Sequence, residues 1–120
     1  MPRTRSSSSR NPMERIAALA DDLADIMGRT HSQQELSILL EGLLTPTEIE
    51  GITLRWQLLK FLADGMPQRR IQERLGICLG KISRGSRLLK YGNPDFVELI
   101  ARIRNERMLQ GKNNEPMEET

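Results

Sequence analysis

Residues 67–90 read PQRRIQERLGICLGKISRGSRLLK, and the fold can be worked out from this stretch. Two pairs of apolar residues fall at helical spacing, one on each side of Gly76. These pairs are Ile71 with Leu75, and Ile82 with Leu89. Glycine favours a turn at the end of a helix. The stretch therefore predicts two short amphipathic helices, joined by a tight turn and held together by their apolar faces.

Positive charge is concentrated in the same part of the chain. Residues 66–90 contain seven Lys and Arg residues against Glu73 alone, a net charge of +6, while the whole chain carries +2, which leaves −4 for the rest. The basic residues are Arg69, Arg70, Arg74, Lys81, Arg84, Arg87 and Lys90. Such a concentration favours a polyanionic partner, and the plainer alternative is a solvated basic surface.

Two helices joined by a glycine turn, with this charge, have the layout of a helix-turn-helix, whose second helix enters the major groove. We therefore predict double-stranded DNA as the partner. The alternative is a helical protein–protein module, such as an antitoxin-like or adaptor dimer, whose basic face binds something else. An enzyme lacks support, because one His, one Cys and no carboxylate cluster offer no nucleophile–base pair.

Outside this stretch, the sequence marks further helix starts. A capping side chain precedes a Glu by three residues at Asn11, Ser32 and Thr45, and Pro follows the first and the last of them. We expect Gly28 to end the first helix, and Asn93-Pro94 to open one more after the basic stretch. Only 3% of the residues are aromatic. The sequence predicts an all-α fold of about six helices.

The helix after Thr45 is apolar nearly all round, which requires neighbours on every side. Its apolar residues are Ile49, Ile52, Leu54, Trp56, Leu58, Leu59, Phe61, Leu62 and Ala63. A chain of 120 residues has few helices to spare for this. We therefore predict a homodimer whose interface is largely formed by the second, third and sixth helices.

The ends of the chain differ from its middle. We expect one helical domain over residues 11–110, with disordered tails at 1–10, which is basic and can add phosphate contacts, and at 111–120. Cys78 has no Cys or His neighbour for a disulfide or a metal site. No apolar run is long enough for a membrane span, and no signal peptide is seen. We expect a cytoplasmic protein that is neither exported nor anchored.

The residues of the basic stretch and its surroundings resemble the tryptophan operon repressor family over about residues 36–105. The resemblance rests on Leu44-Thr45-Pro46, Arg55, Gln68-Arg69, Leu75-Gly76, Ile82-Ser83-Arg84-Gly85-Ser86 and Leu89-Lys90. It implies a wholly helical, intertwined homodimer that binds free L-tryptophan as corepressor and has no other cofactor. It further implies that the liganded protein represses transcription at operators of tryptophan metabolism.

The resemblance also implies a ligand pocket formed by Leu44, Thr45, Arg55, Arg84 and Gly85. Two guanidinium planes can sandwich an indole ring, and Arg84 can also meet a carboxylate. Main-chain carbonyls near Leu44 would receive the ammonium group. The alternative is that Arg55 and Arg84 only extend along the surface or form ion pairs there.

On the DNA side, the resemblance implies contacts from the starts of both helices and from the end of the second. The residues concerned are Gln68, Arg69, Leu79, Gly80, Lys81, Ser83 and Lys90. We expect Arg69 to read a base, because its fork matches guanine O6 and N7, and the lysines to contact phosphates.

The sequence departs from the family pattern at several positions. Leu88 stands where the family usually has a serine that helps to hold the ligand's amino group. Gly80 and Lys81 replace small and hydroxyl-bearing residues, the turn Gly65-Met66-Pro67 is one residue shorter, and Trp56 is unusually bulky. A regulator of the same fold that is independent of ligand, or uses another one, is therefore the alternative.

Overall fold

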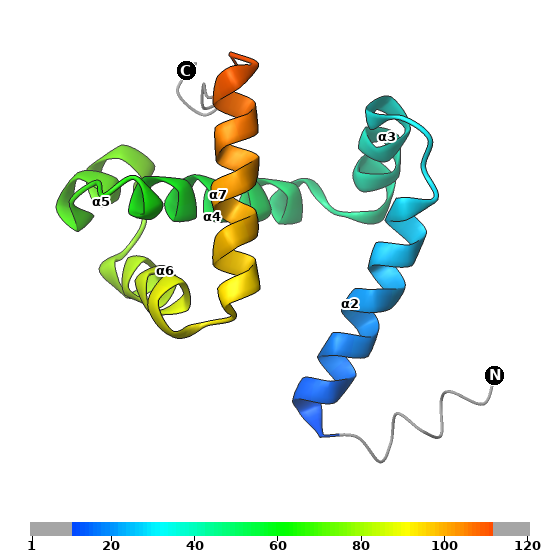
Figure 1. Ribbon diagram of the computed structural model, residues 1–120, viewed down its shortest axis with the longest axis horizontal. Coiled ribbons are helices and arrows are strands. Elements are labelled where there is room, and N and C mark those ends of the chain that lie inside the picture. Colours follow the sequence, from blue (N-terminus) through cyan, green and yellow to red (C-terminus); the bar gives the residue numbers. More distant parts are fainter. Residues whose placement is uncertain (1–10, 112–120) are drawn as a thin grey trace. The chain divides into compact units, whose positions relative to one another are not determined.

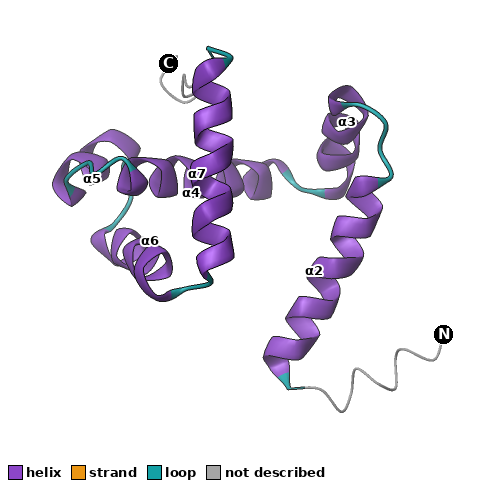
Figure 2. Cartoon of the chain, viewed as in Figure 1, coloured by secondary structure: helices purple, strands orange, loops and turns teal. Residues whose placement is uncertain are grey.

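The computed structural model describes residues 11–111, and this part of the chain is helical without any strand (Figures 1 and 2). Its helices are α2 (Pro12–Gly28), α3 (Gln33–Leu43), α4 (Pro46–Ala63), α5 (Gln68–Leu75), α6 (Leu79–Tyr91) and α7 (Pro94–Leu109). The all-α prediction with six helices is confirmed. The predicted tails fall on residues 1–10 and 112–120, outside the described residues, whereas Gly111 lies in the turn after α7.

The predicted capping residues start the first three helices. Glu14 N–H donates to Asn11 Oδ1 over 2.8 Å, and Asn11 N–H donates back to Glu14 Oε1. Thr45 and Glu48 make the same reciprocal pair. Ser32 Oγ accepts the N–H of Glu35, but Glu35 accepts the N–H of His31 instead of that of Ser32. Local sequence therefore fixes where these helices begin.

The chain divides into two compact units, Met1–Ile49 and Glu50–Thr120. In the first unit, α2 and α3 bury no residue completely. Their apolar residues remain largely open to solvent, with Ile16, Leu19 and Leu23 on α2 and Ile38 on α3 among the most exposed. These two helices alone do not form a core.

The second unit contains a core that joins α4 to the helix pair α5 and α6. Leu58 and Phe61 of α4 pack with Ile71 of α5, Ile77 of the turn and Ile82 of α6. Ile71 and Ile82, two of the four predicted anchors, are 0% exposed. Burying such side chains stabilises a fold by about 1.5–3 kcal/mol each. The pair α5 and α6 is therefore held to α4 by its apolar faces.

Further contacts fix the ends of these helices. Gly76 adopts a left-handed φ of 66°, and its N–H donates to Gln72 O over 2.8 Å, which ends α5 at the predicted glycine. Arg74 lies over the Phe61 ring, 5.3 Å from its centroid. Arg104 of α7 forms an ion pair with Asp64, the residue after α4, with 3.0 Å between Arg104 Nη1 and Asp64 Oδ1. The two groups are not aligned for a hydrogen bond.

Burial along α4 differs between its two halves. The five consecutive residues 57–61 are buried, including the polar Gln57 and Lys60, so this half of the helix is covered on every side by its own chain. Earlier in the helix, Ile52 is 57% exposed. The sequence predicts apolar residues all round α4, and the chain itself buries them only in the second half of this helix.

Candidate ligand and DNA-binding site

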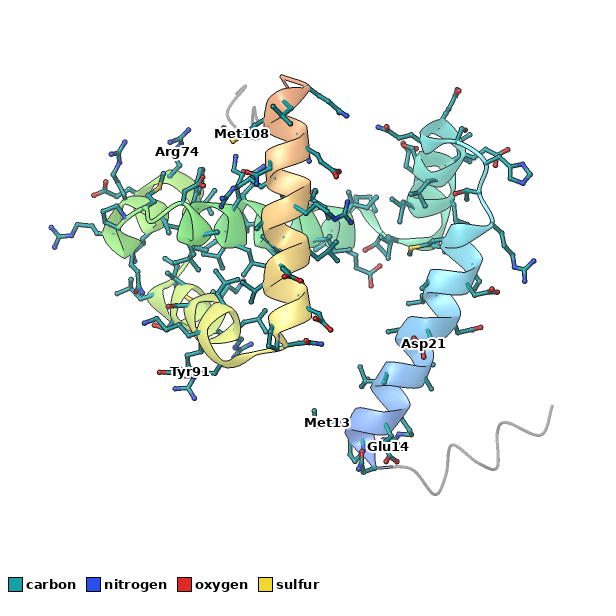
Figure 3. All side chains as sticks on the ribbon, viewed as in Figure 1. Met13, Glu14, Asp21, Arg74, Tyr91 and Met108 are labelled. Carbon is teal, nitrogen blue, oxygen red and sulfur yellow. The ribbon has the colours of Figure 1, made fainter. Side chains whose placement is uncertain are left out.

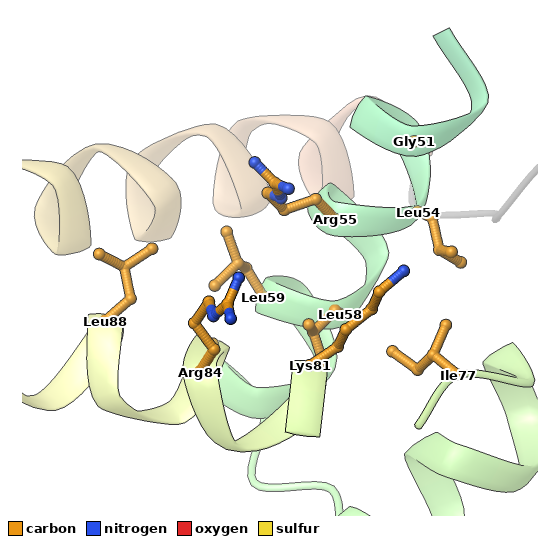
Figure 4. A pocket seen from close by; sticks show the side chains of 10 residues that line it. Gly51, Leu54, Arg55, Leu58, Leu59, Ile77, Lys81, Arg84 and Leu88 are labelled. Carbon is orange, nitrogen blue, oxygen red and sulfur yellow. The ribbon is translucent and has the colours of Figure 1, made fainter. Parts of the chain in front are cut away.

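A cavity of about 300 Å³ opens between α4 and α6 (Figure 4). Its lining residues are Gly51, Leu54, Arg55, Leu58, Leu59, Ile77, Lys81, Arg84, Gly85 and Leu88. This volume is at the lower end of the range for small-molecule sites. The cavity therefore has the size of a site for a small molecule.

Three of the predicted ligand contacts meet at this cavity. Arg55 comes from α4, and Arg84 and Gly85 come from α6 (Figure 4). The other two, Leu44 and Thr45, belong to the first unit, where Leu44 ends α3 and Thr45 caps α4. The role of all five residues in ligand binding remains a prediction.

The electrostatics of the cavity favour an anion. Arg55, Lys81 and Arg84 all line it, and none of its lining residues is acidic. Among residues 11–111, no carboxylate forms an ion pair with any of the three. A carboxylate entering the cavity would therefore meet guanidinium and ammonium donors that have no carboxylate partner in the described part of the chain.

The surfaces of α6 separate according to helical spacing. Lys81, Arg84 and Leu88 follow one another at i, i+3 and i+7, and they form the stripe that lines the cavity. Ile82 and Gly85 are buried on the neighbouring stripe, toward α4. A ligand in the cavity would touch α6 directly.

Gly85 lets α6 approach α4 closely. An added Cβ at this position would stand 3.1 Å from Leu58 Cδ2 and 3.2 Å from Leu62 Cδ1. Any larger residue would push on leucines that belong to the core or pack against it. Gly85 therefore sets the width of the cavity through the spacing of the two helices.

The residues predicted to meet DNA are all exposed. Gln68 and Arg69 begin α5, Leu79, Gly80 and Lys81 begin α6, and Ser83 and Lys90 follow along α6. Leu79, Ser83 and Lys90 are spaced by four and seven residues and share one stripe of α6, which differs from the stripe lining the cavity. Tyr91, in the last turn of α6, is 77% exposed and points outward (Figure 3). Exposure makes all seven available for contact, while their roles remain predictions.

Cys78 occupies the N-cap position of α6 and is exposed. The backbone N–H of Lys81, which donates to Cys78 O over 3.2 Å, faces this end of the helix, and it lowers the pKa of the Cys78 thiol below its usual value, with smaller contributions from Gly80 N–H and the Lys81 charge. Burial acts in the opposite direction but does not outweigh these donors. The thiolate of Cys78 therefore forms at a lower pH than that of an ordinary cysteine, at the start of a helix predicted to meet DNA.

Sequence reasoning missed several residues that line the cavity. Lys81 was expected at DNA, yet its side chain lies along the cavity wall (Figure 4). Gly51 had no assigned role, although it lies four residues before Arg55 and so shares its helix face. That i, i+4 spacing was the only signal in the sequence that could have pointed to Gly51.

Two further findings concern sites of other kinds. No group of three or more His, Cys, Asp or Glu side chains in the described residues could hold a metal ion. None of the helices over residues 11–111 has the length and apolar character needed to cross a lipid bilayer.

Comparison with known proteins decides the family. The sequence pattern of the Trp repressor protein family matches residues 18–114. The chain belongs to the Trp repressor family. As a member of the Trp repressor family, the protein is a DNA-binding transcriptional repressor and not an enzyme.

Relatives described as Trp operon repressor homologues agree with this assignment. One from Mannheimia succiniciproducens is 45% identical over 69 residues, which cover 57% of this chain and 68% of the relative. One from Photobacterium profundum is 34% identical over 68% of this chain and 80% of its own length. One from Pasteurella multocida is 33% identical over 77% of this chain and 86% of its own length. No match to a solved structure was found.

Proposed function

We propose that this repressor binds L-tryptophan in the cavity between α4 and α6, and that the ligand acts as corepressor at operators of tryptophan metabolism in the cytoplasm. The observation that carries the proposal is the set of three cationic side chains, without ion-pair partners among residues 11–111, around a cavity of about 300 Å³. The indole ring stacks between the guanidinium planes of Arg55 and Arg84, and Arg84 receives the carboxylate. Carbonyls near Leu44 and Thr45 accept the ammonium group.

The ligand controls DNA binding through α6. Arg84 and Gly85 line the cavity on the same helix whose first turn carries the proposed DNA contacts Leu79 and Gly80. A ligand that fits one orientation of α6 better than others shifts the population toward it. By linkage, L-tryptophan and operator DNA strengthen each other's binding by the same factor.

Titration of L-tryptophan tests the proposal. Calorimetry measures ligand affinity, and fluorescence anisotropy of labelled operator DNA, with and without ligand, measures coupling. Arg84→Ala is expected to lose ligand binding, while Arg87→Ala, which removes the same charge from an exposed position outside the cavity, should keep it. If L-tryptophan fails to bind at millimolar concentration while operator DNA still binds, the protein is a regulator that ignores this ligand.

We also propose that the repressor is an intertwined homodimer. Support comes from apolar side chains that remain exposed on the helices predicted to form the interface: Ile38 on α3, Ile52 on α4 and Leu99 on α7. A second copy of the chain would cover these exposed apolar side chains.

Light scattering tests the dimer. The protein is expected to be dimeric at micromolar concentration. Ile38→Glu should weaken the dimer, whereas Gln34→Glu, which adds the same charge at an exposed polar position of α3, should not. A fully helical monomer at tens of micromolar would contradict the intertwined arrangement.

A further inference from the structure

Nothing in the structure of residues 11–111 requires a glycine at position 51. It lies within α4, has no positive φ, and is exposed. An added Cβ would meet no atom within 4 Å. Glycine is a poor helix former compared with alanine, so this position costs α4 stability without a gain in packing or backbone freedom.

The position of Gly51 supplies the missing reason. It lines the cavity, and it lies one helical turn before Arg55 on the same face of α4 (Figure 4). Residues four apart on a helix have Cβ atoms about 5–6 Å from each other. Position 51 therefore borders the same cavity beside the residue on which the ring is proposed to stack.

We propose that Gly51 keeps space open for the aromatic ring of the ligand, and so determines how large a ring the cavity accepts. This inference rests on the proposed function, in which a planar aromatic carboxylate stacks on Arg55. A side chain at position 51 would occupy the space that the ring needs. Gly51 is thus a specificity-determining residue of the binding site.

Two series of variants test the inference. Gly51→Ala and Gly51→Leu add side chains of increasing size at a position that favours good helix formers. Gly42→Ala and Gly42→Leu are the matched controls, because Gly42 is also exposed, helical and free of neighbours within 4 Å, but does not line the cavity. Thermal unfolding followed by circular dichroism is expected to show that all four fold and that both alanine variants melt higher than the wild type.

Calorimetry with L-tryptophan then gives the decisive readout. Gly51→Ala is expected to weaken binding about tenfold, and Gly51→Leu more strongly, while the Gly42 variants bind as the wild type does. If the wild type binds L-tryptophan and the Gly51 variants bind it equally well, the inference is wrong and the proposed function stands. If the wild type does not bind L-tryptophan, both the inference and the proposed function are wrong. A changed assembly state of Gly51→Ala in light scattering also overturns the inference, because position 51 then serves subunit packing.

Discussion

Gly85 of α6 lies so close to Leu58 of α4 that a Cβ atom at position 85 would stand 3.1 Å from Leu58 Cδ2. Leu58 is itself part of the core and has little room to move. The two helices that border the cavity are therefore in contact through a residue without a side chain.

Gly85→Ala is expected to lower the free energy of unfolding by about 1 kcal/mol, because overpacking outweighs the better helix propensity of alanine. Gly80→Ala is the control in the same helix, since its Cβ would meet only Cys78 Sγ, at 3.8 Å. That change should raise the free energy of unfolding by up to about 1 kcal/mol. Chemical denaturation measures both, and shifts of the same sign would contradict the packing argument.

Leu88→Ser is expected to strengthen L-tryptophan binding. Leu88 is 40% exposed at the cavity, and no side chain lining the cavity offers a hydroxyl or carboxylate acceptor to an ammonium group. A serine hydroxyl would add one hydrogen bond, worth about 1 kcal/mol or about fivefold in affinity. Calorimetry should show this gain for L-tryptophan and none for indole-3-propionate, which lacks the amino group. Leu79→Ser, outside the cavity, should leave both affinities unchanged.

Arg69→Ala and Lys90→Ala should weaken DNA binding in different ways. Loss of a base contact by Arg69 reduces discrimination between operator and random DNA by about 1–3 kcal/mol. Loss of a phosphate contact by Lys90 weakens both DNAs alike and lowers the salt dependence. Anisotropy titrations at several salt concentrations separate the two effects. Equal losses for both DNAs in Arg69→Ala would refute its role as a base reader.

Cys78 is expected to react with maleimides faster than an unperturbed thiol near neutral pH. Because backbone N–H donors lower its pKa, the thiolate, which is the reactive form, becomes abundant at a lower pH than usual. The rate should therefore rise with pH and level off earlier than for a free thiol. A group attached at the start of α6 should block operator binding, and operator DNA should protect the thiol.

Mass spectrometry follows this reaction, and anisotropy measures its effect on DNA binding. Cys78→Ser, the control, should bind DNA with or without maleimide treatment. If the modified wild type still binds the operator with unchanged affinity, the start of α6 does not approach DNA closely.

The parts of the fold that depend on neighbouring residues in sequence could be predicted. Capping pairs such as Asn11 with Glu14 act within one turn, and the left-handed Gly76 ends α5 by its own conformational freedom. The buried faces of α5 and α6 followed from helical spacing around Ile71 and Ile82. Local rules and periodicity were sufficient for these features.

Features that depend on tertiary packing could not be predicted in this way. Gln57 and Lys60 are buried although their side chains are polar, and helical spacing alone does not predict the burial of a polar residue. The place of Lys81 on the cavity wall was missed for a related reason. Helical spacing tells which residues share a face, but it does not tell what that face meets.

The position of Lys81 has a consequence for how such repressors diversify. Its side chain borders the cavity beside Arg84, and it is also one of the proposed DNA contacts at the start of α6. If Lys81 serves both the proposed ligand site and the proposed DNA contact, a substitution there would change the response to the metabolite and the choice of target gene in a single mutational step. After a gene duplication, a mutation at position 81 would therefore change both the signal and the target of one copy. A change in the signal alone would have to come from a residue such as Leu88, and a change in the target alone from a residue such as Ser83.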